Sequence, residues 1–271
     1  MRIIVFLRRL CGPPELVGSE RVIGRCDEAS LHVALELRAG LSAASAATSA
    51  ATSATVTAIA VGSAAQEGKA LEYALQLGVD RAICVDEPKL ATIDYRGVGR
   101  ILATVARQTG YDMVLAGDRS EDESLGATGA TIAEWLGIPH LTGIRDLEIA
   151  AEADAVSAPQ AKGAQPVSIV LATRWEQGTV RTVRVPLPAV LAIASSSSLA
   201  SPVRKEHEPS SRAEKKTERI VLQQLGLNAD ELGQRSSFLG RLCPLRAGRK
   251  VVFLANGSDL VARLHDDRLL A

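Results

Sequence analysis

The sequence predicts a doubly wound α/β fold, in which helices cover both faces of a mainly parallel sheet, followed by an antiparallel hairpin and a C-terminal arm. Short apolar runs recur along the first half of the chain, and segments with helical spacing of apolar residues separate them. The runs are apolar throughout, which is typical of parallel strands buried on both faces. Only residues 166–193 show the alternation of a hairpin with one solvated face. Alternating strands and helices call for a parallel sheet.

The elements of the first half follow in order. Residues 2–7 (RIIVFL) are the predicted first and central strand, and a helix over 24–37 has Asp27 as its N-cap. Residues 41–55 are almost entirely Ala, Ser and Thr, which predicts a flexible surface insertion. Apolar runs predict further strands at 56–62, 82–85 and 113–116, and helical spacing predicts helices over 68–77 and 95–108.

Residues 111–139 organise the chain. The strand Met113–Ala116 ends at Gly117, a polar acidic loop follows, and a helical pattern begins near Thr128. Strand, Gly-bearing loop and helix start form the geometry in which backbone N–H groups bind a phosphate. Neither the P-loop spacing nor the dinucleotide fingerprint is present. The pattern alone therefore leaves two interpretations, a nucleotide site or an ordinary turn capped by Ser124 or Thr128.

The second half has a different character. Residues 141–150 are predicted to be extended, and 167–173 with 180–185 form the hairpin. A Ser-rich, charged linker follows over 194–216, and the chain closes with a short strand at 251–253 and a helix from Asp259. The predicted division is therefore an α/β domain over 1–193 and a C-terminal arm over 194–271.

The composition bounds the class of function. Among 271 residues, 46% are hydrophobic, 3% are aromatic, and 31 basic residues balance 31 acidic ones. A surface without basic excess and with few aromatic side chains argues against nucleic acid as a partner. No apolar run reaches the length of a membrane span, and the Cys and His residues lack metal-ligand spacing. We expect a cytoplasmic protein that does not insert into membranes.

The stretch from Gly117 to Gly129 resembles the nucleotide-binding segment of electron transfer flavoprotein beta subunits. The family's acidic positions fall on Asp122 and Glu123, and the Thr of its Thr-Gly step falls on Thr128. A second motif, a basic residue, an acidic turn, a strand and Leu-Pro-Ala-Val-Leu, is similar to residues 174–191. Gly126 and Ala127 depart from the family's Asn-Gln or Ala-Gln, so side-chain donors to the nucleotide are lost.

The resemblance implies an electron carrier subunit rather than an enzyme. Such a beta subunit forms a heterodimer with an alpha subunit and carries electrons from dehydrogenases towards a quinone-linked oxidoreductase. The resemblance implies that the alpha subunit holds most of the FAD site, that this subunit holds AMP or a second FAD, and that the arm wraps the alpha subunit. The implied cofactor-binding residues are Phe6, Cys26, Asp27, Val61, Gly117, Asp122, Glu123, Leu125, Gly126, Ala127, Thr128 and Gly129.

Two alternatives stay open at this point. Asp27 and Glu28 match acidic positions of the family at a helix start, but helix capping and dipole matching explain them equally well. The whole chain could also be a stand-alone adenine-nucleotide-binding regulatory module on the same Rossmann-like fold, because fold resemblance alone does not fix function.

Overall fold

The computed structural model describes residues 1–8, 22–48, 53–87, 93–121, 124–149, 169–195, 217–232, 254 and 256–267. Contacts divide the chain into one unit of Met1–Ser236 and another of Ser237–Ala271. The elements, in chain order, are β1 (Arg2–Phe6), α2 (Arg25–Thr48), β2 (Thr55–Gly62), α3 (Ala64–Leu77), β3 (Arg81–Asp86), α4 (Tyr95–Thr109), β4 (Met113–Gly117), α5 (Thr128–Leu136), β5 (His140–Ile149), β6 (Ile169–Glu176), β7 (Thr179–Pro186), β8 (Ala189–Ile193), β9 (Glu218–Ile220), the short 3₁₀ helices η3 (Leu222–Leu225) and η4 (Ala229–Leu232), and α7 (Gly257–Asp266).

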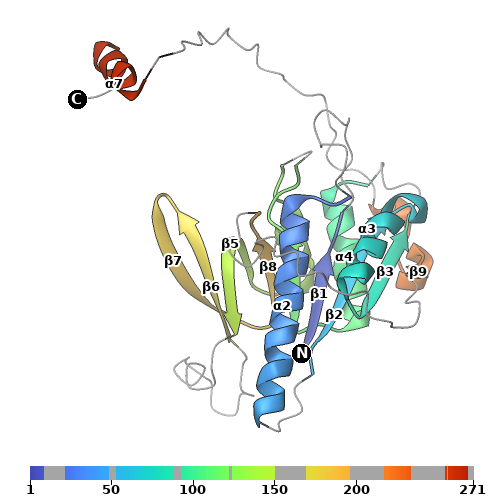
Figure 1. Cartoon of the computed structure of the whole chain (residues 1–271). Coiled ribbons are helices and arrows are strands. Elements are labelled where there is room, and N and C mark those ends of the chain that lie inside the picture. Colours follow the sequence, from blue (N-terminus) through green and yellow to red (C-terminus); the bar gives the residue numbers. More distant parts are fainter. Residues whose placement is uncertain are drawn as a thin grey trace. The chain divides into compact units, whose positions relative to one another are not determined.

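The described strands form one sheet in the order β7-β6-β5-β8-β4-β1-β2-β3-β9. From β8 to β9 the strands run parallel, and β5 pairs parallel with β8. β6 and β7 pair antiparallel as a hairpin at one edge of the sheet (Figure 1). The predicted fold class, a mainly parallel sheet with an antiparallel hairpin, is confirmed.

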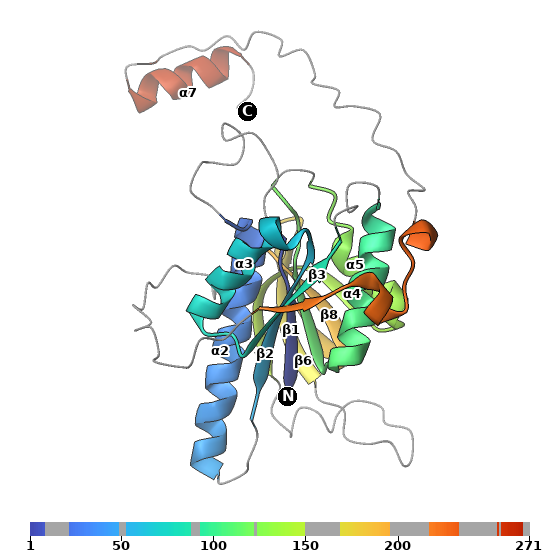
Figure 2. The same cartoon turned by 90° about the vertical axis from the view of Figure 1, so that its right-hand side faces the viewer.

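Helices cover the two faces of the sheet as separate layers. Figure 2 shows α2 and α3 on one side of the strands and α4 and α5 on the other. Successive side chains of a strand point to opposite faces, so Ile3 and Val5 join the core under α2 and α3 while Ile4 and Phe6 join the core under α4 and α5. This two-sided burial explains why β1 is apolar from Ile3 to Phe6.

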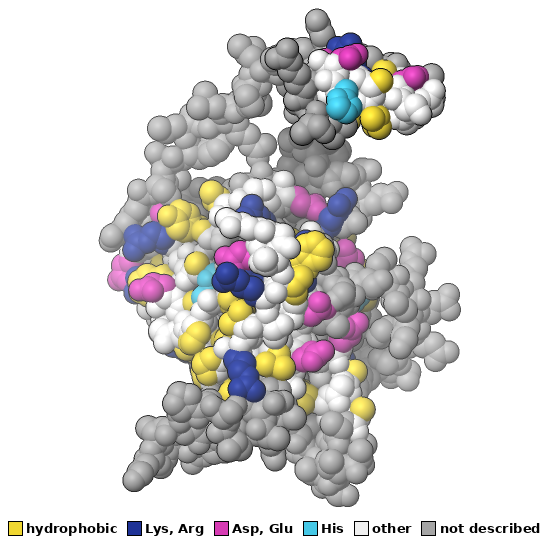
Figure 3. Space-filling view, turned by 90° about the vertical axis from the view of Figure 1, so that its left-hand side faces the viewer, with side chains coloured by type: hydrophobic (Ala, Val, Ile, Leu, Met, Phe, Trp, Pro, Cys, Tyr) yellow, Lys and Arg dark blue, Asp and Glu magenta, His cyan; other side chains and the backbone are white. Residues whose placement is uncertain are grey.

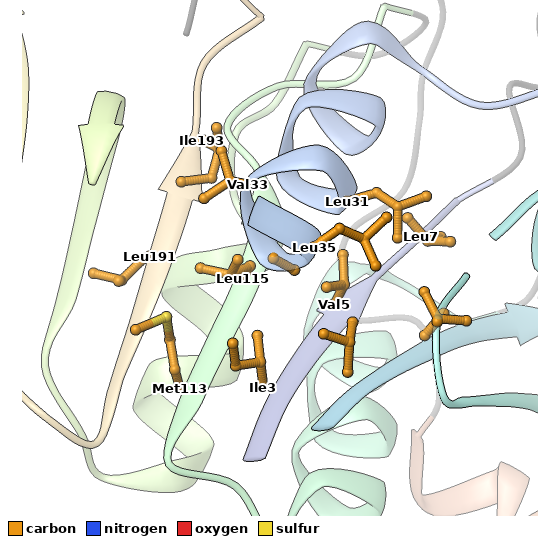
Figure 4. Close-up of a cluster of buried hydrophobic side chains, with 14 of the residues drawn as sticks. Ile3, Val5, Leu7, Leu31, Val33, Leu35, Met113, Leu115, Leu191 and Ile193 are labelled. Carbon is orange, nitrogen blue, oxygen red and sulfur yellow. The ribbon is translucent and has the colours of Figure 1, made fainter. Parts of the chain in front are cut away.

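The core under α2 lies at the centre of the parallel sheet. Leu31 and Leu35 of α2 pack over side chains from three neighbouring strands (Figure 4). Those side chains include Val5, Leu115 and Leu191, and each of the three is completely buried. The segment from 2 to 7 is therefore the central strand that the sequence predicts.

The helix α2 is longer than its predicted span. It continues to Thr48, so the prediction that residues 41–55 form a flexible insertion is wrong for residues 41–48. The physical reason is the alanine content of the segment, because Ala is the strongest helix former and loses no side-chain entropy in a helix. The chain enters β2 at Thr55, and residues 49–52 lie outside the described part of the chain.

Residues 217–232 pack on the α/β unit, although the sequence prediction assigns them to the arm. β9 pairs parallel with the outer edge of β3, where Arg81 and Glu218 form an ion pair of 2.8 Å and Arg219 pairs with Asp86. The segment that follows buries its leucines against the α4 layer, and these are Leu222, Leu225, Leu227 and Leu232. The leucines at 222 and 225 thus have a core within their own chain.

The helix α7 belongs to the second unit. Asn256 caps it by accepting a hydrogen bond from the N–H of Asp259 at 3.0 Å. No residue of this helix is buried, and the side chains of Leu260 and Val261 are about half exposed. The predicted strand at 251–253 lies outside the described residues.

Candidate functional site

The carboxyl ends of β1 and β4 form the switch point of the sheet. After β1 the chain builds β2 and β3 on one side, and it then crosses to β4 on the other side of β1. In doubly wound sheets the ligand site lies beyond the strand ends at such a point. Phe6 and Gly117, the last residues of these two strands, are therefore placed at the expected position.

The first turn of α2 packs directly on Gly117. A β-carbon at residue 117 would overlap the Asp27 carboxylate and lie 3.0 Å from the β-carbon of Cys26. Asp27 Oδ2 also accepts a hydrogen bond from the N–H of Arg8 at 3.0 Å. Three predicted site residues are thus brought together. Asp27 lies inside the first turn of a helix that begins at Arg25, so its predicted position as the N-cap is wrong.

The loop after β4 is held by polar contacts within itself and with β5 and α2. Asp118 Oδ1 accepts a hydrogen bond from the N–H of Gly143 at 2.9 Å, and Ser124 donates its N–H and its hydroxyl to the carbonyl oxygen of Ser120. The start of α2 also contacts this loop, because Glu121 Oε1 lies 3.3 Å from Arg25 Nε. Asp122 and Glu123, both predicted site residues, lie outside the described residues.

The start of α5 has no side-chain cap. Its N-cap residue is Ala127, so the prediction that Ser124 or Thr128 caps this turn is wrong. The first N–H groups of a helix have no intrahelical acceptor, and Ala127 offers them none from a side chain. Gly126 has a φ of +62° and would place a β-carbon 3.2 Å from the carbonyl oxygen of Asp118. The loop therefore closes on itself and presents backbone donors at Thr128 and Gly129.

The remaining predicted residues differ in exposure. Phe6 and Val61 are buried in the core under α4 and α5, with 4% and 7% of their surface exposed. Val61 lies near the end of β2, the neighbour of β1 on the other side from β4. Leu125 projects into solvent and is 62% exposed. Phe6 and Val61 thus form an apolar floor beneath the strand ends, whereas Leu125 is a surface side chain of the loop.

His140 is a residue of this region that the sequence reasoning missed. Its Nε2 is buried without a hydrogen-bond partner, and a β-carbon at Gly129 would lie 2.8 Å from that atom. Burial lowers the pKa of His140 below its ordinary value, and the charge of Asp118 partly opposes this shift. No spacing signal connects these residues, because only the placement of β5 beside β8 brings residue 140 under α5.

Within the described residues, no group of three or more His, Cys, Asp or Glu side chains is arranged to hold a metal ion. In the same ranges, no helix combines the length and the apolar character that a membrane span requires.

The layered sheet, its switch point and the glycine-rich entry to α5 define a doubly wound α/β protein. The family model for the electron transfer flavoprotein domain matches residues 36–222, which is more than half of the chain. The chain therefore belongs to the electron transfer flavoprotein domain family, and the recognition made from its motifs is confirmed. The match includes the loop from 117 to 129 and the hairpin motif at 174–191.

Curated relatives carry the same family name. The chain is 28% identical over 203 residues to a protein of Methylophilus methylotrophus named electron transfer flavoprotein subunit beta, and the alignment covers 72% of this chain and 70% of that relative. It is 29% identical over 171 residues to a protein of the same name from Mycobacterium bovis, covering 61% and 56% of the two chains. These relatives support a role in an electron transfer flavoprotein.

Proposed function

We propose that this chain is the beta subunit of a heterodimeric electron transfer flavoprotein in the cytoplasm. In this role it is an electron carrier subunit, which takes electrons from dehydrogenases and passes them towards a quinone-linked oxidoreductase. The alpha subunit supplies most of the FAD site, and residues 237–271 are the part of the predicted arm that is left to wrap it. The beta-subunit names of the relatives support this assignment.

The proposed nucleotide, AMP or a second FAD, lies at the switch point with its phosphates at the start of α5. One observation carries this proposal: the first turn of α5 is uncapped, directly beyond the strand end that packs on α2. Backbone N–H groups of Thr128 and Gly129 would donate to a phosphate, and the Thr128 hydroxyl would add a donor. Ala127 supplies no side-chain donor. When bound, FAD supplies the electron-transfer chemistry of the site.

The other predicted site residues shape the site around the nucleotide. Cys26 and Asp27 position the first turn of α2 against Gly117, and Phe6 and Val61 form the apolar floor of the strand ends. Leu125, Gly126 and Ala127 form the turn into α5. For Asp122 and Glu123 we propose contacts with the ribose, hydrogen bonds within the loop or exposure to solvent, because two carboxylates cannot face a phosphate without a cation between them.

The test is nucleotide content after the chain is co-expressed with its alpha subunit and the purified complex is denatured. Gly126→Asp places a carboxylate near the proposed phosphate, and Gly126→Asn is its matched control, because Asn has nearly the same shape and tolerates a positive φ. We expect Gly126→Asp to release at least about tenfold less AMP or FAD than Gly126→Asn, a difference of roughly 1.4 kcal/mol. Equal release from both variants and the wild type would show that the loop is not the site.

Two further outcomes of the same experiment decide the rest of the proposal. If the wild-type complex releases no nucleotide, the departure at Gly126 and Ala127 has removed binding, and the segment is a structural turn. If the chain purifies alone, with bound nucleotide and without a yellow partner, the stand-alone nucleotide-binding module replaces the heterodimer as the function.

A further inference from the structure

The two edges of the sheet differ in whether another strand of the chain covers them. At one edge the chain covers β3 with its own strand β9. At the other edge β7 is eight residues long and, among the described strands, pairs with β6 only. Alternate residues of an edge strand turn their N–H and C=O groups away from the sheet, where a further strand can bind them. The outer edge of β7 can therefore pair with a strand of another chain.

The end of the hairpin carries two exposed apolar side chains that lie directly opposite one another. Trp175 and Val180 are partners in register, and each is 60% exposed. Directly opposite residues project from the same face of a sheet, so the two form one apolar patch. The Arg145 guanidinium lies over the Trp175 ring, 4.3 Å from its centroid. The ring is thus held in place before any partner binds.

The composition of the hairpin is that of an interface rather than of ordinary surface. Residues 169–186 contain three arginines and one glutamate, without Lys or Asp. Aromatic residues and arginine are enriched at protein interfaces, whereas Lys, Asp and Glu are depleted. A strand edge that charges merely protect from aggregation has no need of an exposed tryptophan. Figure 3 views the molecule from the side of this hairpin and shows hydrophobic and basic side chains next to one another.

Charge selects the kind of partner. Glu176 lies 3.3 Å from the Arg181 side chain and 3.8 Å from that of Arg174, so a single carboxylate serves two guanidinium groups. By sequence, residues 169–186 have a formal net charge of +2 in a chain whose formal net charge is zero. β7 itself contains Arg181 and Arg184 and no acidic residue. Pairing with a second copy of β7 would bring four arginines together, which is unfavourable.

We propose that the docking edge, which consists of Val180, Arg181, Thr182 and Arg184 of β7 together with Trp175 of β6, binds an extended acidic segment of the alpha subunit as an additional strand. The identity of the partner rests on the proposed function, and the acidic character of the segment rests on the charge of the hairpin. Main-chain hydrogen bonds to the strand edge give affinity in this mode of recognition, and the apolar patch and the arginines give specificity.

The test measures the dissociation constant between the full-length chain and its alpha subunit. We expect Trp175→Ala to weaken binding about 10- to 100-fold, as the loss of an interface hot spot does. Arg184→Glu should also weaken binding, with an effect that shrinks at high salt. Arg96→Glu, an exposed charge reversal on α4, is the matched control and should leave the dissociation constant unchanged. Circular dichroism and nucleotide content identify any variant that has lost its fold.

Each contrary result has a distinct meaning. If the wild-type chain binds the alpha subunit and the hairpin variants bind it equally well, the docking edge is wrong while the heterodimer stands. If the hairpin variants instead break a dimer of this chain with itself, the occupant is a second copy, and the acidic partner is overturned. If the wild-type chain binds no alpha subunit, the proposed function fails and the assignment of this edge fails with it.

Discussion

The imidazole of His140 lies directly against the backbone of Gly129 in the first turn of α5. A β-carbon at residue 129 would lie 2.8 Å from His140 Nε2 and 3.7 Å from the β-carbon of Ala192. The helix therefore approaches β5 and β8 closely because residue 129 has no side chain. The same contact fixes the position of the backbone donors that we assign to the nucleotide.

Gly129→Ala should destabilise the chain by about 1–3 kcal/mol, because an added methyl group in a closely packed contact forces its neighbours to move. Urea unfolding of the variant and of the wild type measures the difference. The matched control is Gly129→Ala in a His140→Ala background, where the space left by the imidazole should absorb the methyl group. Strictly additive effects of the two substitutions would contradict the contact.

The His140 environment predicts a decline in stability on mild acidification. Burial lowers the pKa of His140 below its ordinary value of 6.5, against the opposing charge of Asp118. The folded chain then binds fewer protons at this position than the unfolded chain, so stability falls as the pH drops through the ordinary pKa towards the folded one. Urea unfolding at several values between about pH 5 and 8 measures this slope. His140→Gln should flatten the slope, and an unchanged slope would assign the effect to another group.

Asp86 links the start of α3 to the covering strand β9. Its Oδ1 accepts a hydrogen bond from the N–H of Ala64 at 2.8 Å, and its Oδ2 pairs with Arg219. The Ala64 N–H, more than Arg219, holds the pKa of Asp86 below its usual value, although burial opposes this. Asp86→Asn should therefore cost about 1–3 kcal/mol near neutral pH.

The contribution of Asp86 to the free energy of unfolding also depends on pH, but its cause differs from that for His140. The pKa of Asp86 is lowered because hydrogen bonds favour its charged form, whereas the pKa of His140 is lowered because burial disfavours its charged form. Because the folded pKa is lowered, the stabilisation is fully present above the ordinary pKa and is lost as the pH falls towards the folded pKa. The difference in unfolding free energy between wild type and Asp86→Asn should shrink in acid. A difference that stays constant from neutral to acidic pH would mean that the carboxylate charge is irrelevant.

The packing of residues 217–232 predicts two different truncation results. A chain that ends at Ser236 keeps the whole first unit, so its free energy of unfolding should match that of the full chain. A chain that ends at 216 should be less stable by several kcal/mol, because buried leucines each contribute about 1.5–3 kcal/mol. Leu225→Ala tests the same packing without truncation and should cost about 2–5 kcal/mol. Equal stability of both truncated chains would remove this segment from the core.

The central elements could be predicted from the sequence because burial leaves a direct pattern. Strands buried on both faces are apolar at their buried positions, as residues 3–7 are, while Arg2 at the start of β1 is exposed. The glycine-rich loop at 117–129 was predicted for the same local reason, since a strand end, a turn and a helix start each have characteristic residues.

Other features depend on packing between distant segments and leave no local pattern. Burial of Leu222 and Leu225 results from the docking of β9 on β3, which joins residues more than a hundred positions apart. The contact of His140 with Gly129 arises from strand order. The extension of α2 was missed for a different reason: a run rich in Ala and Ser indicates low complexity, although its alanines favour a helix.

The place of β8 between β4 and β5 constrains how the molecule is made on the ribosome. β5 leaves the ribosome before β8, yet β8 separates it from β4 in the finished sheet. Residues 140–149 and the hairpin after them therefore cannot join the parallel strands until residue 193 has been synthesised. Until then the nascent chain carries an open β4 edge, to which an unrelated strand could add. Synthesis that slows between residues 149 and 189 would prolong this exposure and favour aggregation.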